Sequence, residues 1–95
     1  MFVRVVRFTD VTAERVDALL AQIEQADGPP PGSAPTRLEM VFDAAQGTAL
    51  SLQYFATAED MEAGAKVFDA MDPTETPGTR VSVDMCELKL AMTAP

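Results

Sequence analysis

Four polar side chains in this sequence have the types and spacing from which a small ligand site could be built: Arg4, Glu39, Gln53 and Asp84. Each lies in a segment of alternating or β-branched residues, and the alternation predicts that all four project from one face of a sheet. An arginine on that face can grip a carboxylate or a phenolate, while Asp84 or Glu39 can accept a proton. One interpretation is that these residues line a cavity for a small organic ligand, and we assign no catalytic residue.

The same polar patch also has a structural interpretation. Arg4 and Asp84 are expected on neighbouring strands, close enough for an ion pair. Ionic groups inside interfaces usually satisfy one another and set the register of a dimer. This structural interpretation is favoured over the ligand cavity, and both remain open.

Two further side chains with chemical potential are expected to be structural. Tyr54 is the single tyrosine and shares the parity of Leu50 and Leu52, which predicts a core position facing the helices. Cys86 is the single cysteine, and the chain has no histidine to activate it. A small buried side chain is therefore the expected role of Cys86.

Acidic residues gather where the second predicted helix ends, at Asp69, Asp72 and Glu75. Their spacing matches no calcium-binding loop, so a solvated acidic edge is expected. Arg80 follows Pro77-Gly78, and it reaches either toward the mouth of a cavity or only to these acids.

The composition limits the classes of function. Without histidine, and with one cysteine, the chain lacks the usual zinc ligands, so we expect no metal and no cofactor. Seven basic against fifteen acidic residues give a net charge of −8, and no two basic residues are adjacent. Nucleic acid and anionic membrane surfaces are therefore not expected as partners. With one cysteine, no secretory signal and no apolar run near membrane-spanning length, the expected location is cytoplasmic.

The chain length and hydrophobic periodicity predict a single domain, residues 1–95, of alternating strands and helices. Strands are expected at 2–8, 37–43, 49–55 and 80–90, and helices at 12–27 and 57–71. Thr12 and Thr57 stand where side chains that cap helix N-termini belong. A Pro/Gly-rich connection covers 28–36, and 44–48 forms a hairpin turn.

These elements predict an α+β, ferredoxin-like βαββαβ fold with strand order 4-1-3-2 and both helices on one face of the sheet. The expected helix-facing core consists of Leu38, Met40, Phe42, Leu50 and Leu52. The opposite face is expected to carry Val6, Phe8, Val41 and Phe55, with Cys86 near a change of phase in the last strand. A bulge near Met85-Cys86, or a strand passing to a partner, explains that change. So much apolar surface predicts a homodimer in which a second sheet covers the first.

This layout resembles the dimeric α/β-barrel superfamily. Within it, residues 54–88, YFATAEDMEAGAKVFDAMDPTETPGTRVSVDMCEL, are similar to small actinobacterial proteins without an assigned function. The resemblance implies a homodimer whose two sheets enclose a cavity or a packed barrel. Antibiotic-biosynthesis monooxygenases, haem-degrading enzymes and ligand binders share that layout. The histidine typical of haem-binding members and the tryptophan of haem-degrading members are both absent here.

The function expected from these observations is that of a small dimeric α/β-barrel protein that binds a small organic ligand between its sheets or serves a structural role. The alternative is a cofactor-independent monooxygenase-like enzyme acting on a phenolic or polyketide-like substrate. A third hypothesis is a protein-interaction module that uses an exposed sheet edge. Whether the chain is an enzyme stays open at this stage.

Overall fold

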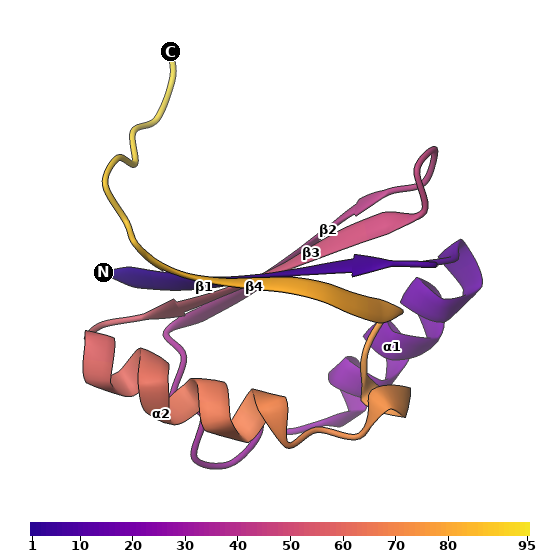
Figure 1. Cartoon of the computed structure of the whole chain (residues 1–95), viewed down its shortest axis with the longest axis horizontal. Helices are drawn as coiled ribbons and strands as arrows, with labels where there is room; N and C mark the ends of the chain where they lie inside the picture. The colour runs from indigo at the N-terminus through magenta and orange to yellow at the C-terminus, as the bar shows by residue number, and fades with distance from the viewer.

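The chain folds into one four-stranded sheet with two helices on one side of it (Figure 1). The computed structural model describes the backbone of residues 1–95 and every side chain except that of Pro73. The elements are β1 (Phe2–Thr9), α1 (Ala13–Gln25), β2 (Arg37–Asp43), β3 (Thr48–Phe55), α2 (Ala58–Asp69), a 3-10 turn (Pro73–Glu75) and β4 (Thr79–Glu87). The C-terminal tail leaves the sheet on the side opposite the helices (Figure 1).

The strands lie in the order β2-β3-β1-β4, and every neighbouring pair is antiparallel. This is the predicted order 4-1-3-2 counted from the other edge, so the ferredoxin-like α+β layout is confirmed. β1 and β3 are the two interior strands. Side chains at their centres are therefore the ones most readily covered by the helices.

Both predicted helix caps are present. The Thr12 hydroxyl accepts from the Arg15 amide at 3.2 Å, and the Thr57 hydroxyl accepts from the Asp60 amide at 3.0 Å. Each bond satisfies an amide that the first helical turn leaves without a partner. Each helix begins one residue after its predicted start and ends two residues before its predicted end.

The predicted assignment of side chains to the two sheet faces is wrong for β1 and β3. The hairpin pairs Asp43 with Thr48, so even-numbered residues of β2 stand opposite odd-numbered residues of β3. Met40 is therefore paired with Ser51, and Leu50 and Leu52 lie on the face away from the helices. The four residues between Asp43 and Thr48 set this register, and a shift of one residue exchanges every side chain between the faces.

The helix side carries the core that was expected on the opposite face. Val6, Phe8 and Ala49 pack with Val11 and with Val16 of α1. Phe55, which was also expected on the far face, is fully buried. It lies against α2 at Gly64, where an added Cβ would stand 2.5 Å from the Phe55 ring. Close approach of helix and sheet therefore depends on the absence of a side chain at position 64.

We call the sheet face away from the helices the open face. It carries Val3, Val5 and Arg7 of β1, Leu50, Leu52 and Tyr54 of β3, Arg37, Glu39, Val41 and Asp43 of β2, and Ser82, Asp84 and Cys86 of β4. Tyr54 is on this face, so its predicted position facing the helices is wrong. Cys86 stands opposite Val3 and is half-buried rather than buried.

The irregularity in β4 lies earlier than predicted. Arg7 pairs with Ser82 and Phe8 pairs with Arg80, so Val81 is the extra residue of a bulge. From Ser82 to Glu87 the register is regular, and the expected bulge at Met85-Cys86 is absent. The change of apolar parity instead reflects Val83, which packs on the core, and Cys86, which faces away from it.

None of the described helices is both long and apolar enough to span a bilayer.

Candidate functional site

Arg4 is the most deeply buried charged side chain of the described structure, with 2% of its surface exposed. Its strand is interior, and its parity is that of Val6 and Phe8, so the guanidinium points to the helix side of the sheet. One guanidinium nitrogen (Nη1) donates to Gln53 Oε1 at 2.8 Å, and the other (Nη2) donates to Asp69 Oδ1 at 2.6 Å. The Phe68 ring lies beneath the group, with its centroid 5.8 Å from Cζ. The Arg4 guanidinium of β1 is thus held by residues of β3 and α2.

The environment of Arg4 shifts its pKa in opposing directions. Desolvation by burial is the largest effect and lowers the pKa of the guanidinium, whereas the Asp69 carboxylate raises it. The nearby Arg80 charge lowers it further. Among the described side chains, Arg4 Nε is the one buried polar atom without a hydrogen-bond partner. A buried donor without a partner is unusual in folded proteins and calls for an explanation.

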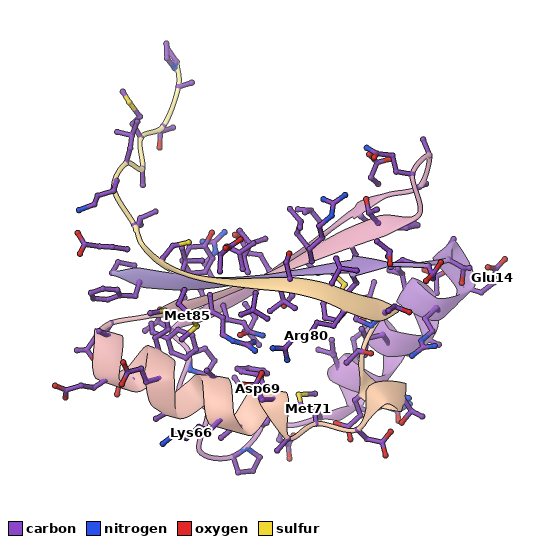
Figure 2. The ribbon with its side chains drawn as sticks, in the orientation of Figure 1. Glu14, Lys66, Asp69, Met71, Arg80 and Met85 are labelled. Carbon is purple, nitrogen blue, oxygen red and sulfur yellow. The ribbon has the colours of Figure 1, made fainter. Side chains whose placement is uncertain are left out.

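Asp69 joins Arg4 to a second arginine at the surface. Its Oδ1 also accepts from Arg80 Nη1 at 2.7 Å, and both of these side chains are nearly half exposed. The bulge at Val81 is what places Arg80 opposite Phe8 and therefore on the helix side. Figure 2 shows Asp69 and Arg80 pointing toward one another between α2 and β4, while Lys66 points away. We call Arg4, Asp69 and Arg80 the arginine–aspartate chain.

Beside this chain lies an open-sided pocket of about 570 Å³ between the end of α2, the start of α1 and the start of β4. Its lining consists of Asp10, Arg15, Phe68, Asp69, Met71, Thr76, Gly78, Thr79 and Arg80. The volume falls within the range of about 300–1,000 Å³ that is usual for small-molecule sites. Apolar surface from α2 and its C-terminal extension thus meets charged groups from three segments.

Two backbone features shape the wall of the pocket. Asp10 has a φ of 58°, a left-handed conformation that a non-glycine residue rarely adopts. Gly78 passes so close to β1 that an added Cβ would lie 2.3 Å from the Thr9 carbonyl oxygen. Backbone strain and close approach are both common at functional sites, because the surrounding structure must hold them.

The four predicted ligand residues are divided between the two faces. Arg4 and Gln53 lie together on the helix side, hydrogen-bonded to each other. Glu39 and Asp84 are on the open face, on strands at opposite edges of the sheet. The expected Arg4–Asp84 ion pair is wrong, because Asp84 is paired with Val5 and projects from the other face. Asp69 takes its place as the partner of Arg4.

Glu39 belongs to a separate cluster on the open face. Its carboxylate accepts from the Tyr54 hydroxyl at 2.8 Å and from Arg37 Nε at 3.0 Å. The Tyr54 hydrogen bond, followed by that of Arg37, holds the pKa of Glu39 below its ordinary value. The same bond raises the pKa of Tyr54. The cluster is exposed, and it keeps Glu39 ionised.

Asp69 and Phe68 were not among the residues predicted for a site, although the sequence contains a signal for Asp69. Arg4 has the parity of Val6 and Phe8, and a buried arginine requires a carboxylate from whatever covers it. Asp69 follows Ala65 by four residues, and Ala65 follows the buried Met61 by four, so the three share one face of α2. Arg80 was predicted to reach either the mouth of a cavity on the other face or the nearby acids, and in the structure it pairs with one of those acids, Asp69, and lines the pocket on the helix side.

The described side chains contain no group of three or more acids or cysteines arranged to hold a metal ion. The lining of the pocket supplies charged, hydrogen-bonding and apolar groups. A comparison with protein-family models, curated proteins and solved structures finds no match to this chain.

Proposed function

We propose that this protein is a homodimeric domain that binds a small organic molecule in the pocket beneath its sheet. The observation that carries the proposal is the pocket beside the arginine–aspartate chain, with the fully buried Arg4 behind it. Burying a guanidinium is costly, and an apolar side chain of similar length would serve packing as well. A binding role explains why the cation stands at the centre of the sheet.

The composition of the lining supports a small ligand rather than a macromolecule. Phe68 and Met71 contribute apolar side chains to the lining, and Thr76, Thr79 and Arg80 contribute polar ones. Binding sites for small molecules usually combine a largely apolar wall with a few placed polar groups. The ligand was expected between two sheets, and the helix-side position of Arg4 and Gln53 is the reason that we propose the space beneath the sheet.

The homodimer is proposed from the open face. Its interior strands expose part of Val5, Leu50 and Leu52, and Val41 at the edge is 52% exposed. A contiguous apolar face of this kind is costly to leave in water. The face also carries both signs of charge, with Arg7 as an example of one sign and Asp84 of the other. A two-fold interface, which pairs a surface with itself, requires such a mixture.

Membership of the dimeric α/β-barrel superfamily is part of this proposal, and the ferredoxin-like layout supports it. The monooxygenase-like alternative has less support. It requires a carboxylate poised to accept a proton, and Glu39 is occupied by Tyr54 and Arg37, which lower its pKa. A purely structural role accounts for the bonds of Arg4 to Gln53 and Asp69, but it gives no use to the pocket beside them.

A library of small organic molecules, screened by backbone-amide NMR against the full chain, tests the ligand proposal. Binders are expected to move the resonances of Phe68, Gly78 and Arg80, which surround the pocket. Substituting Phe68→Ala is expected to weaken such binders about tenfold, since an aromatic side chain supplies much of the contact area. Val41→Ala, on the open face, is the control. A screen without a binder at the pocket overturns the ligand proposal, whatever the oligomeric state.

A further inference from the structure

The lining of the pocket carries as many basic as acidic side chains, on a protein that is strongly acidic as a whole. The net charge of the chain is −8, yet three of its seven basic residues, Arg4, Arg15 and Arg80, lie in or directly behind this pocket. Two acids, Asp10 and Asp69, accompany them in the lining. With Arg4 behind the lining, three arginines stand against two acids in this region, so an anion meets less repulsion here than over the acidic protein as a whole.

The two bonds of Asp69 differ in how firmly they are held. The bond to Arg4 joins a carboxylate to a guanidinium that is 2% exposed, and losing it would leave a buried charge without compensation. The bond to Arg80 joins two side chains that are 44% and 49% exposed, and exposed ion pairs are weak. Asp69 can therefore release Arg80 at low cost while it keeps Arg4.

Arg80 is suited to receive a second carboxylate. A guanidinium has five N–H donors in a planar fork that matches the two oxygens of a carboxylate, and Asp69 takes one of them through Nη1. Phe68 and Met71 stand in the same lining as Arg80. An anion with a flat apolar body therefore matches both halves of the pocket.

We propose, on the basis of the ligand-binding function above, that the pocket takes small carboxylates, aromatic ones in particular. When the pocket holds no carboxylate ligand, the Asp69 carboxylate pairs with Arg80 in its place. On binding, the ligand carboxylate takes over Arg80, its ring packs on Phe68 and Met71, and Asp69 stays on Arg4. No bond is made or broken covalently.

Matched pairs of acid and amide test this proposal: benzoate with benzamide, phenylacetate with phenylacetamide, and succinate with succinamide. Each is titrated into the full chain and followed by calorimetry and amide NMR. At least one acid is expected to bind about tenfold more tightly than its amide, as a charge-assisted bond requires. Arg80→Gln removes a half-exposed side chain, and it is expected to abolish this preference while the amide is unaffected. Arg37→Gln, which removes an arginine from the open face, is the control and leaves both affinities unchanged.

Asp69→Asn supplies a second measurement. The asparagine oxygen still accepts from Arg4, but it no longer competes for Arg80 as an ion, so the acid is expected to bind several-fold more tightly and the amide equally well. If acid and amide bind the pocket equally, the carboxylate proposal is wrong and the ligand-binding function stands. If no member of the panel binds while other library molecules do, the same conclusion follows. If no molecule binds at all, both proposals fail.

Discussion

Arg4 lies on the helix side of β1, on the same face as the apolar side chains of Val6 and Phe8. Its stem lies in the core, and its charge is met by Gln53 on the neighbouring strand and by Asp69 on α2. A single residue thus links the sheet to the helix layer and to the pocket. Substitutions at this position therefore measure how much of the stability comes from the volume of the side chain and how much from its guanidinium bonds.

Arg4→Ala is expected to lower the free energy of unfolding by about 3 kcal/mol, because it leaves a cavity and removes the partner of two polar groups. Arg4→Met refills most of the volume, and Asp69 remains paired with Arg80 at the surface, so a loss of about 1 kcal/mol is expected. Urea denaturation measures both values. Equal losses for the two variants would show that the guanidinium bonds, rather than the volume, hold the fold at this point.

Tyr54→Phe is expected to raise the pKa of Glu39 toward its ordinary value, since the Tyr54 hydrogen bond is the largest cause of its depression. A lowered carboxylate pKa contributes stability above the ordinary pKa, and that contribution is lost as the pH falls through the lowered value. The native protein and the variant should therefore differ in stability at neutral pH and converge in acid. Carbon-detected NMR titration of Glu39 measures the shift, with Ser51→Ala as the control on the other face. An unchanged Glu39 titration would contradict the assignment.

At the scale of elements, the type and order of the strands and helices follow from local pattern, whereas the assignment of faces does not. The caps Thr12 and Thr57 and the two apolar helix stripes are local signals, and the predicted elements are present. The register of the β2–β3 hairpin depends on how many residues stand between Asp43 and Thr48. The alternation of both strands is equally regular in either register, so the sequence could not decide which face Arg4 and Gln53 share.

The candidate site was only partly predictable for the same reason. Arg4 and Gln53 were predicted to line a ligand cavity on the other face of the sheet, and Arg80 to reach either a cavity mouth or the nearby acids. Asp69 was assigned to a solvated acidic edge, because its contact with Arg4 spans 65 positions of the chain. The position of the bulge at Val81, which turns Arg80 toward the helices, depends on pairing between β1 and β4 and has no local signal.

Gly64→Ala tests the contact between α2 and the sheet. Alanine favours helix by about 1 kcal/mol over glycine, so helix propensity alone predicts stabilisation. The new Cβ would lie 2.5 Å from the Phe55 ring and 2.7 Å from the Ser33 carbonyl oxygen, so we expect a net loss of about 2 kcal/mol by thermal or urea unfolding. Ala63→Gly, one residue away on the exposed side of the same helix, is the control and costs about 1 kcal/mol. A stabilised Gly64→Ala would contradict the close packing of α2.

For the whole molecule, the two faces of the sheet have separate roles in the proposed function: the helix side binds a ligand and the open face binds a second copy. Because the pocket and the open face lie on opposite sides of the sheet, a substitution on one is expected to leave the other intact. Additive behaviour is usual for sites that share no partners. The two proposals can therefore fail independently.

Leu52→Glu introduces a charge at the middle of the open face, between Val5 and Glu39. The native protein is expected to have twice the chain mass of 10.2 kDa in light scattering, and this variant is expected to have the mass of one chain. Leu20→Glu, at a 44% exposed position on α1, is the matched control and should remain dimeric. A native mass of one chain at micromolar concentration would refute the dimer.

The most direct test of the central claim, a small-molecule pocket beneath the sheet, is a map of backbone-amide shifts on titration with the tightest carboxylate or library binder. The account predicts that the shifts cluster at Asp10, at Phe68 and Asp69, and along 78–80, the segments that line the pocket. Shifts concentrated at Val5, Val41 and Leu52 on the open face would contradict it, as would the absence of any saturable shift.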